Sequence, residues 1–209
     1  MKKIVATTVF LMTIICFAQA QISAGLTVGP AIPTGGYAKF AGIGFGVVGE
    51  GRYVLTDQIS VGINVGHYRT PTKDLNVPLQ FQDGVFAVGY KGNYRSTSVT
   101  TVSEYFLLED EFRPFAGLEA GAFITGYTWK EDEEVVTQAP EFKESKVGFG
   151  IAPIIGALYE LNDGLELSAT IKYTLTGASV QVFENPAFEE KSIHLLTVNF
   201  GIRITPSEF

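Results

Sequence analysis

Apolar and polar residues alternate one by one through long stretches of this chain. From Ile59 to Gly66, every odd position holds Ile or Val and every even position holds Ser, Asn or Gly. The same pattern recurs from Leu165 to Leu175. A repeat of two residues is typical of β-strands, because successive side chains point to opposite faces of a sheet. The pattern predicts an all-β chain with eight strands, over 21–29, 41–55, 59–68, 96–108, 112–129, 145–161, 165–176 and 192–204.

The connections between the predicted strands alternate between short and long. Three short ones contain Asp57, Asp110 and Asp163, and the long ones cover 30–40, 69–95, 130–144 and 177–191. All short turns therefore fall at one end, which is typical of outer-membrane barrels. Most of the predicted strands also reach the ~9 to 11 residues that a tilted strand needs to cross a bilayer. These features predict an eight-stranded antiparallel up-and-down transmembrane β-barrel.

The connection 69–95 contains two short apolar runs, 77–82 and 85–90, on either side of a possible hairpin turn at Asp83 and Gly84. If both runs crossed the membrane, the barrel would have ten strands. Pro78 cannot donate a hydrogen bond to a neighbouring strand, which favours a sheet edge over a barrel wall. We predict a hairpin that stands above the bilayer, with ten strands as the alternative. Its aromatic residues are candidates for recognition of a partner: Phe81, Phe86 and Tyr90.

Residues 1–20 have the layout of a secretory signal peptide, with a basic start, an apolar run over 4–17 and small residues before the expected cleavage site. Cleavage is predicted after Ala20, so that 21–209 form the barrel domain. The apolar run is shorter than the ~20 residues of a membrane-spanning helix. We therefore predict export and, given the barrel pattern, a location in the outer membrane.

The mature chain has no cysteine, because Cys16 lies inside the predicted signal peptide. Disulfides and thiol nucleophiles are thereby excluded. Cleavage also removes two lysines and changes the formal net charge from −7 to −9, which argues against nucleic-acid binding. The acidic connection 130–144 has oxygen ligands that suit Ca²⁺, but it lacks the spacing and turn glycine of a calcium loop. We predict no metal and no cofactor.

The alternation alone does not say which face of the wall is apolar, and a periplasmic lipocalin-like carrier with an apolar interior is an alternative. Glycine, serine and threonine fill the polar rows, and so many glycines on a solvated face would weaken the sheet. In a narrow lumen, small residues make room for charged ones. An eight-stranded barrel is just wide enough to be filled by its own side chains, and charges buried there should pair. The candidates for a lumen ion-pair network are Glu50, Arg52, Glu119, Lys172 and Arg203.

Three segments carry a resemblance to a known family: 29–33, 113–117 and 198–204. In them the chain resembles the small outer-membrane β-barrels, the group that includes the OmpA transmembrane domain, OmpX and OmpW, especially in Bacteroidota-type versions. The resemblance implies contact with outer-membrane lipids and lipopolysaccharide, and insertion by the outer-membrane assembly machinery. Barrels of this family usually end in an aromatic residue, as this chain does at Phe209, although its apolar row ends at Ile204.

The sequence thus predicts an outer-membrane barrel with a filled lumen and a structural, adhesive or interaction role, with the long loops open to an extracellular partner. A narrow conduit for small or hydrophobic molecules is the first alternative. A rim enzyme that modifies lipid A is another, but His67 and His194 lie on strands separated by two others. At ~4.8 Å per strand they would be roughly 14 Å apart, too far to share a catalytic site. We therefore predict no enzymatic activity.

Overall fold

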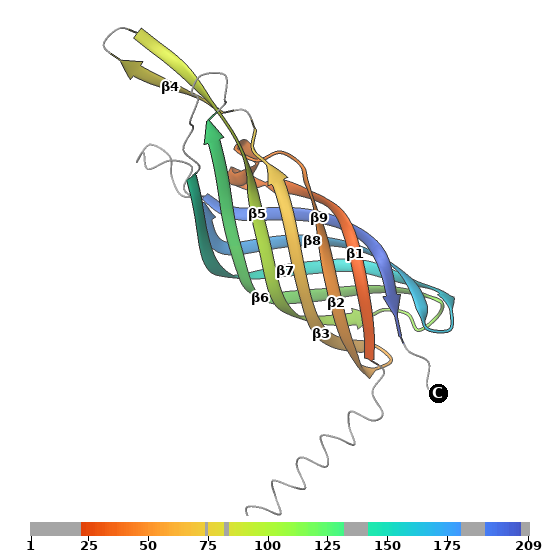
Figure 1. Cartoon of the computed structure of the whole chain (residues 1–209). Coiled ribbons are helices and arrows are strands. Elements are labelled where there is room, and N and C mark those ends of the chain that lie inside the picture. The colour runs from red at the N-terminus through yellow and green to blue at the C-terminus, as the bar shows by residue number, and fades with distance from the viewer. Residues whose placement is uncertain (1–21, 74, 82–83, 132–141, 181–190, 206–209) are drawn as a thin grey trace, which may run out of the picture.

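The computed structural model describes residues 22–73, 75–81, 84–131, 142–180 and 191–205. Nine strands in these residues form one antiparallel sheet (Figure 1). They are β1 (Ile22–Thr34), β2 (Gly44–Thr56), β3 (Ile59–Pro71), β4 (Leu75–Phe81), β5 (Gly84–Phe106), β6 (Phe112–Glu131), β7 (Phe142–Asn162), β8 (Leu165–Val180) and β9 (Lys191–Ile204). The predicted signal peptide and Phe209 lie outside the described residues.

The sheet closes on itself to form a barrel. Its strand order is β3-β2-β1-β9-β8-β7-β6-β5-β4, and β3 also pairs with β5, from Ile59 opposite Tyr105 to Pro71 opposite Asn93. The wall therefore contains eight strands, and β4 stands outside it. This arrangement confirms the predicted eight-stranded antiparallel barrel and excludes the ten-stranded alternative.

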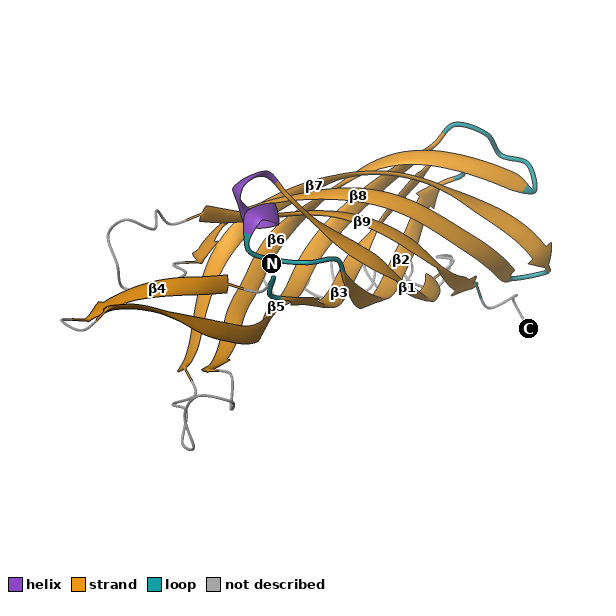
Figure 2. Cartoon of the chain, turned by 90° about the horizontal axis from the view of Figure 1, so that it is seen from above, coloured by secondary structure: helices purple, strands orange, loops and turns teal. Residues whose placement is uncertain are grey.

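The predicted hairpin in the connection 69–95 is present. Strand β4 pairs with the first part of β5, from Leu75 opposite Tyr90 to Phe81 opposite Gly84. Strand β5 has 23 residues, so one continuous strand supplies both an arm of the hairpin and a strand of the wall. Figure 2 shows the hairpin extending away from the barrel. Most of the predicted connection is therefore strand, because the β3–β5 pairing continues as far as Pro71.

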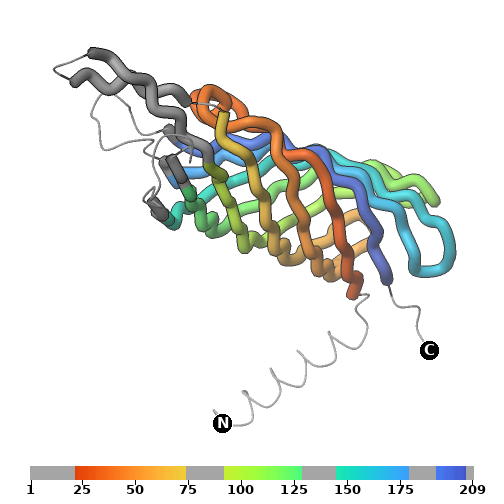
Figure 3. Tube along the Cα trace, turned by 45° about the horizontal axis from the view of Figure 1, so that its top comes forward, coloured from red at the N-terminus to blue at the C-terminus, as the bar shows by residue number. Residues whose placement is uncertain are grey.

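Both ends of the described barrel chain lie at the short-turn end of the wall. Ala24 near the start of β1 pairs with Ile204 at the end of β9, and Figure 3 shows these two strand ends side by side. The short connections after β2, β5 and β7 belong to the same end. The β4–β5 hairpin and the 3-10 helix η1 (Gly35–Lys39) lie at the opposite end, which we call the outer end.

Large apolar side chains cover the outside of the wall. On β3, Ile59, Ile63 and Val65 are exposed, whereas Ser60 and Asn64 are buried. Exposed fractions of such apolar residues reach 72% across the wall strands. A continuous surface of this kind is stable against lipid, and in water it would drive association. We call it the apolar belt, and its direction agrees with the outward-facing apolar rows that the sequence predicts.

Two features near the outer end differ from the predicted elements. Strand β1 runs to Thr34, five residues beyond the predicted end, because its pairing with β9 continues to Thr34 opposite His194. Helix η1 follows directly and is absent from the sequence-based assignment. Five residues are too few to show helical periodicity. No helix in the described ranges is long and apolar enough to cross a membrane.

Candidate functional site

Four charged side chains meet in the lumen toward the short-turn end. They come from β2, β5 and β9 and are each at most 5% exposed: Glu50, Arg52, Glu104 and Arg203. Glu104 lies 2.8 Å from Arg52 Nη2 and 3.2 Å from Arg203 Nη1. Glu50 lies 3.1 Å from Arg203 Nη2 and 3.6 Å from Arg52 Nη2. Two carboxylates thus balance two guanidinium groups, and we call these residues the lumen quartet.

A second ion pair lies next to the quartet in the lumen. Lys172 Nζ on β8 donates to both carboxylate oxygens of Glu119 on β6, at 3.2 and 3.3 Å. Thr100 Oγ1 donates to the same carboxylate at 3.1 Å, and the Asn64 amide nitrogen donates to it as well. The side-chain oxygen of Asn64, Oδ1, accepts a hydrogen bond of 2.6 Å from Arg52 Nη1. Asn64 thus connects the Glu119–Lys172 pair to the quartet.

The structure places all five lumen candidates of the sequence analysis inside the barrel. Three of them belong to the quartet, and the other two form the second ion pair. Glu104, the carboxylate that accepts hydrogen bonds from both arginines, is missing from the sequence-based candidates. A signal for it exists, because it lies on the same inward row of β5 as three buried polar residues, although Val102 interrupts the row before it: Ser96, Ser98 and Thr100. Thr101 and Ser103 on the outward face of β5 weaken the alternation there.

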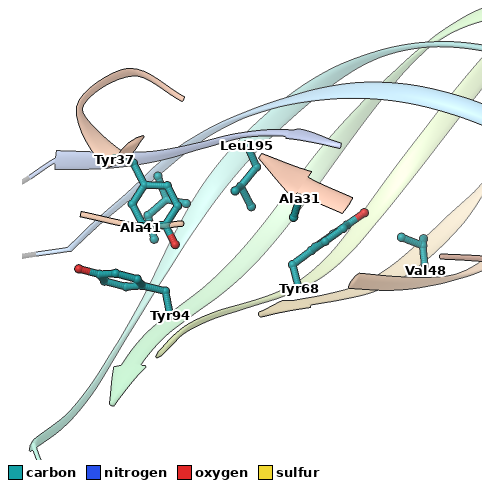
Figure 4. Packing of buried hydrophobic residues seen from close by; sticks show 8 residues of the cluster. Ala31, Tyr37, Ala41, Val48, Tyr68, Tyr94 and Leu195 are labelled. Carbon is teal, nitrogen blue, oxygen red and sulfur yellow. The ribbon is translucent and has the colours of Figure 1, made fainter. Parts of the chain in front are cut away.

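Aromatic side chains fill the lumen at the outer end. Tyr37 reaches from η1 to β3, where its hydroxyl lies 2.6 Å from Thr70 Oγ1. Its ring packs edge-on against Tyr94, with the centroids 5.2 Å apart. Figure 4 shows these rings together with Tyr68 and the aliphatic residues around them. Burial raises the pKa of the Tyr37 phenol, so it stays neutral. The cluster fills this part of the lumen with uncharged side chains.

The short-turn end contains a shallow vestibule. It has a volume of about 250 Å³ and extends inward to Arg52 and Arg203 of the quartet. Arg113 forms an ion pair with Glu166 at its edge and lies 5.2 Å from the centroid of the Phe106 ring. Between the quartet and Glu119 the described void is only about 10 Å³. That is room for at most one water molecule, so among the described residues the vestibule narrows sharply beyond the quartet.

The recognition candidates Phe81, Phe86 and Tyr90 lie on the β4–β5 hairpin. Phe81 is opposite Gly84, Phe86 is opposite Leu79, and Tyr90 is opposite Leu75. Their side chains lie outside the described part of the structure, as does most of the acidic connection 130–144. All three positions thus lie on the two paired strands of the hairpin.

No protein-family model matches the sequence, and no curated protein matches it. Solved structures do match the barrel. Neisserial surface protein A is 12% identical, with a TM-score of 0.56 over 90% of this chain and 99% of that one. A major outer membrane protein from Thermus thermophilus is 12% identical, with a TM-score of 0.55 over 89% of this chain and 98% of that one. The chain has the fold of a small outer-membrane β-barrel.

A third match, the outer membrane protein OprG from Pseudomonas aeruginosa, is 14% identical. Its TM-score is 0.51, over 90% of this chain and 96% of that one. At these identities the similarity concerns the fold, because the eight-stranded wall can be built from many sequences with the same two-residue alternation.

The two histidines lie on the outward face near the outer end. His67 Nδ1 is 2.9 Å from Thr97 Oγ1. The His194 ring lies 6.4 Å from the Tyr173 ring, centroid to centroid. Strands β2 and β1 separate β3, which carries His67, from β9, which carries His194. In the part of the chain that the structure describes, neither ring pairs with a carboxylate.

Proposed function

We propose that this protein is an integral outer-membrane barrel with a structural, adhesive or interaction role that it performs through its outer end. The shared fold, the apolar belt and the predicted signal peptide support insertion in the outer membrane. In that setting the wall contacts outer-membrane lipids and lipopolysaccharide, and the assembly machinery of the membrane inserts it. The long connections then face outward, toward an extracellular partner.

The β4–β5 hairpin is the observation that carries the interaction role. Among the described strands, β4 pairs only with β5, so the N–H and C=O groups along its other edge have no strand partner. Open edges of this kind accept a further strand, and proteins usually protect them. The hairpin also contains the three recognition candidates, Phe81, Phe86 and Tyr90.

The filled lumen supports the same proposal, because it leaves little space for passage of a solute. Aromatic residues pack in the lumen near one end, the Glu119–Lys172 pair lies in the middle, and the quartet follows. Every charged member of these groups has a partner of opposite sign. A solute would have to separate buried ion pairs to pass, which is costly.

Excision of the hairpin tests the interaction role. The backbone of Thr72 already bonds to Gly92 at 3.0 Å, so an Asn-Gly turn can replace residues 74–91 without disturbing the wall. We expect bacteria that display this variant to lose most of the adhesion that the full chain confers, whether to one another or to surfaces coated with matrix protein or glycan. Retained cells are counted after washing. The interaction role is contradicted if bacteria with the full chain and bacteria with the variant are retained equally, or if neither strain is retained.

Planar-bilayer recordings test the conduit alternative. We expect the purified barrel to show no stable conductance steps, because the described central void is only about 10 Å³. Steps that disappear when Glu119 is replaced by Trp would instead show passage through the lumen. A barrel with Glu119→Trp that still migrates as a folded species on an unheated gel provides the control for that result.

The proposal gives the barrel no catalytic role. His67 and His194 stand on different sides of β1 and β2, and neither has a described carboxylate partner to orient it as a base. Release of fatty acid from lipid A by the purified barrel, lost on His194→Ala, would contradict this part of the proposal.

A further inference from the structure

Two arginines lie directly opposite each other on the outside of the wall. The strand register pairs Arg69 of β3 with Arg95 of β5, and both side chains are exposed. Like charges at opposed positions of adjacent strands repel each other. Arg69 Nε donates to Asn93 Oδ1 at 3.1 Å, which leaves its two terminal nitrogens available. Among the described residues, no carboxylate pairs with either guanidinium.

The arginine pair lies at the outer edge of the apolar belt. The row of outward residues on β3 starts at Ile59, ten residues before Arg69, and its partner row on β5 ends at Tyr105, ten residues after Arg95. At ~3.3 Å per residue on a strand tilted by roughly 40°, this distance is about 25 Å along the barrel axis. The apolar band of an outer-membrane barrel is also about 25 Å tall. The two guanidinium groups are therefore at the height of the outer-leaflet headgroups.

The surroundings of the pair combine apolar contact with open space. Phe45 of β2 lies opposite Arg69 and is 59% exposed, while Gly126 of β6 lies opposite Arg95 and has no side chain. Toward the short-turn end, Val65 and Val99 on the same two strands are each 52% exposed. His67 and Thr97 lie between the arginines and these valines, so a hydrocarbon chain of a molecule bound to the arginines passes this polar pair before it reaches the belt.

Further positive residues follow toward the outer end. The backbone register continues on β5 and β6 with Lys91 opposite Lys130. Acidic residues 131–134 follow Lys130 directly in the sequence, so the two arginines, not a wider basic region, supply the positive charge of the site. Positive charge at this height attracts anions from the membrane surface.

We propose that Arg69 and Arg95 together bind the phosphate of an anionic lipid headgroup in the outer leaflet. Each guanidinium donates to the phosphate oxygens, and the anion between them removes their mutual repulsion. The acyl chains pack on Val65, Val99 and Phe45. This inference rests on the proposed membrane insertion of the barrel, and it adds the ligand class and the residues that bind it.

Native mass spectrometry of the full barrel in a nonionic detergent tests the site. The probes are phosphatidic acid, phosphatidylcholine with the same acyl chains, and inorganic phosphate. We expect the barrel to bind phosphatidic acid at least about tenfold more tightly than phosphatidylcholine, and equimolar inorganic phosphate should not displace it. The double variant Arg69→Gln/Arg95→Gln should lose about tenfold in affinity for phosphatidic acid. The control Lys39→Gln removes one exposed positive charge at the same end and should stay within about twofold of the unmodified barrel.

Equal binding of the two lipids, an unchanged affinity in the double variant, or an equal loss in the Lys39→Gln control would overturn the site. Displacement by equimolar inorganic phosphate would show a site for free anions and would overturn the lipid assignment. Each variant is first checked for folded migration on an unheated gel. Fractionation of cells tests membrane insertion separately, so a barrel that reaches the outer membrane but shows no lipid preference refutes this inference alone.

Discussion

Replacement of Glu104 by glutamine is expected to lower the free energy of unfolding by about 3 to 5 kcal/mol. Glu104 is 2% exposed and is the carboxylate that accepts hydrogen bonds from both arginines of the quartet, at 2.8 and 3.2 Å. The change leaves two guanidinium groups with only Glu50 to balance them in a buried space. Removal of one partner from a buried ion-pair group costs more than the group contributes in net stability, because the remaining charge stays desolvated.

Urea-induced unfolding of the barrel in phospholipid vesicles, followed by gel mobility of unheated samples, measures this loss. The matched control is Glu109→Gln, which removes the same charge from an exposed residue near the short-turn end and should change the free energy of unfolding by less than about 0.5 kcal/mol. A loss below about 1 kcal/mol in Glu104→Gln would mean that the quartet tolerates an unbalanced charge. The ion pairs of the quartet would then contribute little to keeping the lumen closed.

The two-residue alternation was enough to predict the wall, and the small and charged residues of the polar rows indicated which face points inward. Each wall strand is constrained independently, because its outward residues are apolar and exposed while its inward residues pack in the lumen. Glu50, Arg52, Glu119, Lys172 and Arg203 could be assigned to the lumen from their rows alone. Which of them meet could not be predicted, since partners such as Arg203 and Glu50 lie 153 residues apart and depend on strand order and register together.

Sequence patterns predicted the structure least well where the pairing of distant strands decides it. The β3–β5 pairing makes residues 69–71 and 93–95 part of the wall, although this stretch has the composition of a connection. The same pairing places Arg69 opposite Arg95, and no alternation in the sequence could reveal that contact across 26 residues. Helix η1 illustrates a different limit, because Tyr37 is buried by contacts with Thr70 and Tyr94 on other strands.

Gly29→Ala is expected to prevent most of the chain from reaching the closed barrel. A Cβ atom at Gly29 would lie 1.9 Å from the carbonyl oxygen of Val198 and 2.8 Å from Asn199 Cα. Both are backbone atoms of β9, so no side-chain rotation relieves the overlap. Strands β1 and β9 contain the two ends of the barrel, and their pairing joins the sheet into a ring. A forced shift there costs about 3 kcal/mol or more and acts on the contact that closes the wall.

The folded fraction after refolding into vesicles, read from unheated gels, measures this effect. Gly201→Ala tests the same seam from the other strand, because its Cβ would lie 2.0 Å from the Leu26 carbonyl oxygen, and it should lower the folded fraction similarly. Gly51→Ala is the control, since the nearest atom to its Cβ would be the Ile63 carbonyl oxygen at 4.0 Å, an ordinary contact distance. If the Gly29 and Gly51 variants fold equally well, close packing at the β1–β9 seam is not what requires glycine. If only the two seam variants fail, barrel closure requires glycine at these specific backbone contacts of the β1–β9 seam.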